Sequence, residues 1–156
     1  MTDIIPIMAW MYEILQQKDI DEILRFEEAR FKEIFPDDIE RKFRLWHSSA
    51  REESLKHYIP LGWSFKICDE DGHLMGFFLA QPLLFFSGYT QVLWVEYLAT
   101  TSLKARDSLI ELIYRLSREK HLQGVFFPSD DSKLVNALSS FKPIPWEGRI
   151  FIATTK

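Results

Sequence analysis

The chain has 156 residues, of which 47% are hydrophobic and 27% are charged, and its formal net charge is -4. A net negative charge disfavours electrostatic capture of nucleic acid or of an anionic membrane, so we expect neither as a partner. One cysteine cannot form an internal disulfide, and its spacing from the four histidines matches no zinc set, so we expect no bound metal.

The composition predicts one globular domain over residues 1–156, with residues 1–10 as an N-terminal extension. This extension is apolar, but it carries Asp3 and Pro6 and is far shorter than the ~20 residues that span a bilayer. We therefore expect neither a signal peptide nor an anchor, and the predicted location is the cytoplasm.

The first predicted elements are a strand at residues 10–16 and a helix at residues 20–34. Asp19 is the expected N-cap of this helix, Glu22 follows three residues later as in a capping box, and Pro36 ends the helical pattern.

A second predicted helix has Asp37 or Asp38 as its N-cap and ends before Pro60. Its charged residues face away from an apolar stripe at helical spacing. The stripe consists of Ile39, Phe43, Trp46 and Ala50.

Two strands are predicted next, at residues 63–67 and 74–79, joined by a tight hairpin turn at Asp71-Gly72. The apolar run at residues 74–86 is interrupted by Gly76, Gln81 and Pro82, which predicts two buried strands that meet at a bend.

The strand predicted at residues 91–100 is apolar on both faces except at Glu96, as expected for a central strand of a covered sheet. The remaining predictions are a helix at 104–120, a strand at 124–127, a helix at 132–139 and a strand at 149–153. The inward residues of the first of these helices are Leu109, Leu112, Ile113 and Leu116. The fold class is therefore α/β (α+β): a mixed central sheet with helices on both faces, in the order β-α-α-β-β-β-α-β-α-β.

This order resembles the GNAT acyltransferase superfamily over nearly the whole chain after Met11. Four short patterns carry the resemblance. They are Tyr12 to Ile23 as the first strand and helix, Asp71-Gly72-His73-Leu74-Met75-Gly76-Phe77 as the hairpin, Val95-Glu96-Tyr97-Leu98-Ala99-Thr100 as the strand that faces the acyl donor, and Ser140-Phe141-Lys142-Pro143 as a late element.

The resemblance implies an N-acyltransferase that moves an acyl group from acetyl-coenzyme A, or another acyl-coenzyme A, directly to an amine of a small molecule or peptide. Many GNAT proteins are homodimers, and an outer ring of the Phe77-Phe78 or Phe85-Phe86 pairs is a candidate contact for one.

The family's glycine-rich loop, which approaches the coenzyme A pyrophosphate, is degenerate in this chain, because residues 100–109 contain no glycine. A residue with a β-carbon costs about 1–2 kcal/mol where a positive φ is required, so we expect the loop to follow a different path.

Two interpretations of this region remain open. In one, the donor lies along residues 98–108, and the amides of 105–108 bind its phosphates together with nearby side chains. The donor-site residues are then Leu98, Thr100, Ser102, Lys104, Arg106 and Ser108. In the other interpretation, these charges are solvated ones in the first turn of a helix.

Glu96 is the first candidate for catalysis. An ionised carboxylate inside an apolar strand must be paired or neutralised. The resemblance implies a base that deprotonates the acceptor amine, whereas the structural alternative is a pair with a basic side chain that holds the strand in register.

The resemblance also places Asn136 where many family members carry a tyrosine acid, and Ser129 where an asparagine is frequent. An amide cannot release a proton at neutral pH, although it can hold a water or a thiolate at a donor site. The alternative function is therefore a non-catalytic GNAT-fold module that has lost coenzyme A binding.

Overall fold

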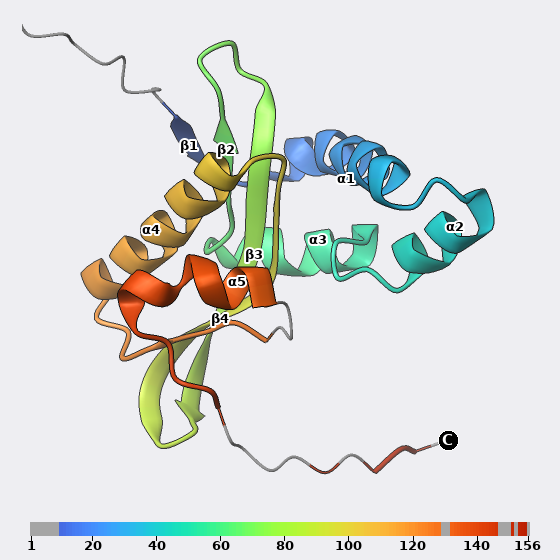
Figure 1. Cartoon of the computed structure of the whole chain (residues 1–156). Helices are drawn as coiled ribbons and strands as arrows, with labels where there is room; N and C mark the ends of the chain where they lie inside the picture. Colours follow the sequence, from blue (N-terminus) through green and yellow to red (C-terminus); the bar gives the residue numbers. More distant parts are fainter. Residues whose placement is uncertain (1–9, 129–131, 147–150, 152, 156) are drawn as a thin grey trace, which may run out of the picture.

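The computed structural model describes residues 10–128, 132–146, 151 and 153–155. At the centre of the fold is a five-stranded sheet (Figure 1). The strand order is β1-β2-β3-β4-β5. The strands are β1 (Met11–Ile14), β2 (Phe65–Cys68), β3 (Leu74–Phe86), β4 (Tyr89–Thr100) and β5 (Val125–Phe126). The first four are antiparallel neighbours and β5 runs parallel to β4, so the sheet is mixed, as predicted.

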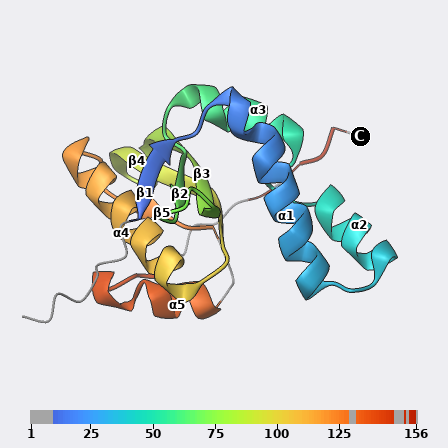
Figure 2. The same ribbon diagram turned by 90° about the horizontal axis from the view of Figure 1, so that it is seen from above.

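Helices lie on both sides of this sheet (Figure 2). They are α1 (Ile20–Ile34), α2 (Asp38–Trp46), α3 (Glu52–Tyr58), α4 (Leu103–Glu119) and α5 (Ser132–Ala137), with short 3-10 turns η1 (Gln17–Asp19), η2 (Ile59–Leu61) and η3 (Ser139–Phe141). The predicted fold class is confirmed, and the predicted last strand at 149–153 lies largely outside the described residues. Within the described part, no helix combines the length and the apolar character needed to cross a bilayer.

Each face of the sheet has its own core. Phe77 packs with residues of α1 and α3, whereas its neighbour Phe78 packs with residues of α4. Both rings are fully buried, because successive side chains of a strand point to opposite faces. Neither ring of this pair is therefore an outer ring for a dimer contact, which corrects that prediction; Phe85, by contrast, is 82% exposed.

Gly76 allows α4 to lie close to the sheet. A β-carbon at this position would stand 2.7 Å from the Ala99 carbonyl oxygen, 2.7 Å from Thr100 Cγ2 and 3.2 Å from Leu109 Cδ1. The first two distances are shorter than real contacts, so the lack of a side chain is required for the packing of β3, β4 and α4.

The apolar run at residues 74–86 is one continuous strand, not two. The bend that Gln81 and Pro82 indicated is absorbed by a register shift against β4 after Leu79. Pro82 lies beyond the end of β2, where β3 has only β4 as a neighbour, and proline is tolerated at such an edge.

The single helix predicted after Asp37 is in fact two helices, α2 and α3, separated by residues 47–51. Ala50 is buried in the core, but the stripe residues of α2 are not: Ile39 is 79% exposed, Phe43 63% and Trp46 72%. Helix α2 lies beside the end of α1 and away from the sheet (Figure 2). Periodicity identified the residues that share a side, but it does not specify what covers that side.

Asp19 stands at the N-cap position of α1 as predicted, but its side chain does not cap the helix. A turn of 3-10 helix precedes α1, and the Asp19 carboxylate accepts hydrogen bonds from the Gln16 backbone N–H at 2.8 Å and from Lys66 Nζ at 3.0 Å. Lys66 is only 8% exposed, and a buried ammonium needs an anionic partner. The Asp19 carboxylate therefore points to Lys66 and not to the first amides of α1.

Candidate active site

The candidate site begins where β4 and β5 separate. Among the residues that the structure describes, the two strands pair at two positions, Leu93 with Val125 and Trp94 with Phe126. Pro128 follows two residues later and has no N–H with which to continue a ladder. Beyond Trp94 the neighbouring side of β4 is therefore left open.

A β-bulge lies at the same point of β4. Leu79 pairs with Tyr97 and Ala80 pairs with Val95, so Glu96 is the extra residue of β4. A bulge bends its strand and changes the direction of its side chains. The carboxylate that interrupts the apolar pattern thus stands at the boundary between the paired and the open parts of β4.

The opening between the strands contains a cavity of about 200 Å³. It is lined by Val95, Glu96, Tyr97, Leu98, Thr100, Arg106, Phe127, Pro128 and Leu134. Four of the predicted site residues are brought together here, namely Glu96, Leu98, Thr100 and Arg106.

The Glu96 carboxylate is held by neutral donors. Trp94 Nε1 donates to Glu96 Oε2 at 2.7 Å, and Ser49 Oγ donates to Oε1 at 3.4 Å. Burial, together with the charge of Glu96 and a hydrogen bond to it, raises the pKa of Tyr58. The carboxylate is thus paired as expected, but these partners are not the basic side chain of the structural alternative.

The next residue, Tyr97, is anchored to α1. Its hydroxyl donates to the Glu27 carboxylate. Arg30 donates two further hydrogen bonds, of 2.9 and 3.0 Å, to the same carboxylate. Burial, followed by the charge of Glu27, raises the pKa of Tyr97 strongly. Glu27 is only 2% exposed, so this network fixes the open half of β4 against the helix.

The sequence analysis missed these supporting residues for different reasons. Trp94 is two positions before Glu96, and side chains two positions apart in a strand point to the same face. This alternation is the signal that could have identified Trp94 as a partner of Glu96. Ser49 and Tyr58 come from the loop after α2 and the end of α3, and nothing local in the sequence connects them with β4.

The connection from β4 to α4 follows a path that needs no glycine. It consists of Thr101 and Ser102, and residues 100–108, all of them described, include none with a positive φ. Thr101 N–H donates to the Met75 carbonyl oxygen at 3.0 Å, which ties the connection to the start of β3. The connection therefore requires no residue in the left-handed region.

The start of α4 differs from the predicted anion site in one respect. Ser102 Oγ caps the helix by accepting from Ala105 N–H at 3.1 Å, and Arg106 N–H donates to the Ser102 carbonyl oxygen at 3.1 Å. The predicted amides of residues 105–108 are therefore engaged within the helix. The first-turn amides without an intrahelical acceptor are those of Leu103 and Lys104.

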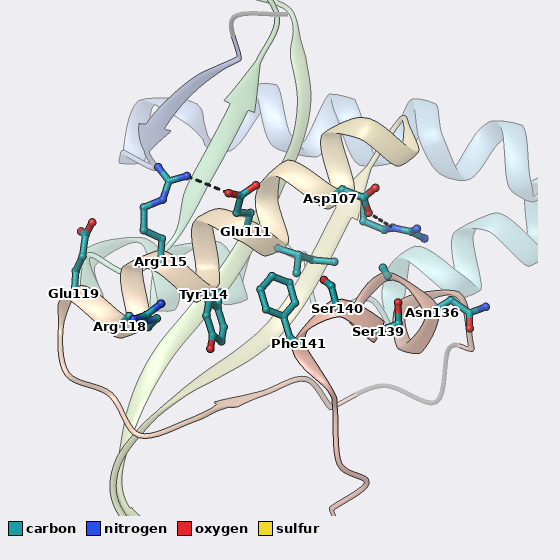
Figure 3. A pocket seen from close by; sticks show the side chains of 13 residues that line it. Asp107, Glu111, Tyr114, Arg115, Arg118, Glu119, Asn136, Ser139, Ser140 and Phe141 are labelled. Atoms are coloured by element: carbon teal, nitrogen blue, oxygen red, sulfur yellow. Dashed lines mark ion pairs between the residues drawn. The ribbon is translucent and has the colours of Figure 1, made fainter. Parts of the chain in front are cut away.

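A larger groove of about 960 Å³ runs between α4 and the segment formed by α5 and η3 (Figure 3). Arg106 lines both this groove and the smaller cavity, and Asn136 lines the groove. Arg106 Nε is buried and has no hydrogen-bond acceptor among the described residues; the nearest carboxylate oxygen is that of Asp107 at 3.8 Å. This unsatisfied donor belongs to a residue that lines both cavities.

Charges of both signs line the groove along α4. Arg115 lies 3.5 Å from Glu111, and Arg118 lies over the Tyr114 ring, which contacts Phe141 from the opposite wall at a centroid distance of 4.5 Å (Figure 3). The groove is thus lined by aromatic rings and by polar groups of both charges, and not by groups of one charge alone.

Three predicted site residues, Ser102, Lys104 and Ser108, line neither cavity. Lys104 is exposed on the first turn of α4, and Ser108 is half-buried one turn later. Ser129 lies outside the described residues.

Comparison with solved structures identifies similar folds. TTHA1254 from Thermus thermophilus superposes with a TM-score of 0.62 at 17% identity, covering 92% of this chain and 99% of that one. The aminoglycoside acetyltransferase meta-AAC0020 from an uncultured soil metagenomic sample, in complex with sisomicin, gives a TM-score of 0.61 at 18% identity, covering 94% and 96%. A GNAT family acetyltransferase from Listeria monocytogenes 4b F2365 gives 0.63 at 11% identity, covering 90% and 89%. No protein-family model matches the sequence. No curated protein matches it.

Proposed function

We propose that this chain, which has the fold of the GNAT acetyltransferases, transfers an acyl group from an acyl-coenzyme A to an amine. One observation carries the proposal: β4 and β5 part at the bulge that bears Glu96, and the cavity between them leads to Arg106 and the start of α4. The carboxylate at one end of this opening suits an acceptor amine. The hydrogen-bond donors at the other end suit the phosphates of the acyl donor.

The donor is proposed to lie with its thioester arm along Leu98 and Thr100. Its phosphates are then next to Arg106, whose buried Nε lacks an acceptor, and next to the positive end of the α4 dipole. The remainder of the donor extends into the groove beside Asn136. The chain residues at these places fit a phosphate-bearing thioester, although Asp107 opposes the negative charge.

Glu96 is proposed to accept a proton from the acceptor ammonium, directly or through one water. The neutral nitrogen then attacks the thioester carbonyl carbon, a C–N bond forms, and the C–S bond breaks, while the nitrogen, cationic after the attack, releases its second proton to water. A thiol has a pKa near 8.5, so the sulfur can leave as a thiolate and take its proton from water without a tyrosine acid. Trp94 and Ser49 keep the carboxylate oriented throughout.

The acceptor is proposed to be an amine of a small molecule or peptide. The similar solved structures include an aminoglycoside acetyltransferase with bound sisomicin, which supports a polyamine-like acceptor class. An amine suits Glu96, because a carboxylate attracts the ammonium form before it removes the proton.

Thermal unfolding with and without acetyl-coenzyme A tests the proposal. Ligand at one hundred times its dissociation constant stabilises the fold by ~2.7 kcal/mol, which corresponds to roughly 5–10 °C in a domain of this size. Arg106→Ala is expected to weaken this shift, and Lys32→Ala, which removes an exposed cation of α1 outside both cavities, is expected to preserve it. No shift with several acyl-coenzymes at millimolar concentration would instead favour the non-catalytic module.

A further inference from the structure

No part of the chain that the structure describes covers the apolar side of α2. Ile39, Phe43 and Trp46 lie on it at intervals of four and three residues, and each is more than half exposed. Leu45, on the other side of the helix, is only partly exposed. Figure 2 shows α2 at the outer end of the molecule, away from the sheet and from α4. Monomeric proteins seldom expose such a contiguous row of large apolar side chains, and such rows mark contact surfaces.

The charges of α2 are distributed unevenly along the helix. The first turn carries Asp38 and Glu40, with Asp37 as the N-cap, and Arg41 pairs with Asp38, whereas the further cations Lys42 and Arg44 lie in the second half. Two such helices placed antiparallel bring the acidic start of each against the basic end of the other. A helix with an acidic start and a basic end is complementary to a second copy of itself related by a two-fold axis. Nucleic acid or an anionic membrane instead requires a surface that is positively charged throughout.

We propose that α2 is a self-association surface on which a second copy of this chain docks antiparallel about a two-fold axis. Ile39 then faces Trp46 of the partner subunit, and Phe43 lies at the axis. Glu40 and Arg44 flank the same edge of the apolar stripe, so Glu40 lies near the partner's Arg44, and the reverse holds by symmetry. This inference concerns the assembly alone and does not depend on the proposed transferase activity.

The dimer is expected to be weak, because one short helix per subunit gives an interface at the low end of the size range. Sedimentation equilibrium of the full chain from about 10 µM to 1 mM covers the corresponding range of dissociation constants. The wild-type mass is expected to rise from that of one chain towards that of two. A single-chain mass throughout would overturn the proposal.

Removal of the central ring tests the location of the interface. Phe43→Ser is expected to raise the dissociation constant about tenfold or more. The matched control is Phe85→Ser, which removes a ring at the β3–β4 hairpin that is even more exposed, at 82% against 63%, and is expected to leave association unchanged. Circular dichroism shows whether both variants fold. If Phe85→Ser weakens association and Phe43→Ser does not, the hairpin is the interface and the proposal is wrong.

A charge exchange tests the antiparallel pairing. In Glu40→Lys the introduced lysine meets the partner's Arg44, and in Arg44→Glu the introduced glutamate meets the partner's Glu40, so each variant alone is expected to associate about fivefold more weakly. An equimolar mixture restores opposite charges across the interface, while the like charges within each helix remain. The mixture is therefore expected to associate about fivefold more tightly than either variant. A mixture no tighter than its components would overturn the antiparallel arrangement.

Discussion

The two halves of β4 share the same partner, β3, but differ on their other side. Before the bulge, Leu93 and Trp94 pair with β5, and Leu93 is fully buried. After the bulge, Tyr97, Leu98 and Thr100 are half-buried and line a cavity.

The difference shows how little is required to open a sheet. One extra residue in β4, Glu96, changes the direction of the strand, and one proline after β5, Pro128, removes the donor that would extend the ladder. On its other side the open half is held by α1, through the hydrogen bond from Tyr97 to Glu27, rather than by a described strand. The predictions below test each half against the other.

The largest effect is expected at the boundary between the halves. Glu96→Gln keeps the shape of the side chain but removes the proton acceptor, so turnover is expected to fall about 10²–10⁴-fold. Thiol release from acetyl-coenzyme A measures turnover, and the thermal shift with the donor is expected to stay unchanged. Glu33→Gln, at an exposed carboxylate of α1, is the matched control. Unaltered turnover in Glu96→Gln would make the bulge carboxylate purely structural.

The second prediction concerns the packing of the open half. Gly76→Ala introduces a β-carbon at 2.7 Å from the Ala99 carbonyl oxygen, so β4 or α4 must move, at a cost of about 1–3 kcal/mol in the free energy of unfolding. Gly124→Ala is its counterpart beside the paired half, where the nearest atoms to the new β-carbon are 3.9 Å away. Urea unfolding is expected to separate the two variants clearly. Equal midpoints would mean that the open half adapts as readily as the paired half.

The third prediction tests the anchor that replaces a neighbouring strand. The raised pKa of Tyr97 means that its hydroxyl stays protonated in the folded chain while it ionises near pH 10 in the unfolded chain. The unfolded state then binds fewer protons, so the free energy of unfolding falls above pH 10, by about 1.4 kcal/mol per pH unit from this group. Tyr97→Phe removes this contribution.

Urea unfolding of both proteins from pH 8 to pH 11 measures the difference. The wild-type advantage over Tyr97→Phe is expected to be constant below about pH 9 and to shrink above pH 10. Parallel curves over the whole range would contradict the buried network of Tyr97, Glu27 and Arg30.

The sequence predicted the order of elements well, because each depends on local spacing. The Asp71-Gly72 turn forms as predicted, with Gly72 at φ +81°, and the helix before β5 buries Leu109 and Ile113. Glu96 was identified because a single carboxylate breaks an apolar strand.

What the sequence left open depends on contacts between distant segments. Ser49 and Tyr58 reach Glu96 from elements that precede it by 38 or more positions, and no periodicity encodes that approach. The stripe of α2 has the same spacing as that of α4, yet one is exposed and the other is buried, since periodicity does not reveal which helix lies against the sheet.

The smallest expected effect lies where the open half of β4 passes into α4. Ser102→Ala removes the cap on Ala105 N–H and is expected to lower the free energy of unfolding by about 1 kcal/mol. Ser102→Asp keeps a good capping group and adds a negative charge at the positive end of the helix, so stability is expected to be retained. The two variants therefore separate capping from charge.

The charge effect then tests whether donor phosphates lie at this point of the chain. An added carboxylate repels a phosphate near the protein surface by an amount on the order of 1 kcal/mol, so Ser102→Asp is expected to weaken acetyl-coenzyme A about fivefold. A pantetheine thioester carries no phosphate and is expected to react equally well with wild type and Ser102→Asp. If both donors lose affinity together, the substitution has disturbed the cavity itself; if neither does, the phosphates lie elsewhere, and the open half of β4 holds at most the thioester arm.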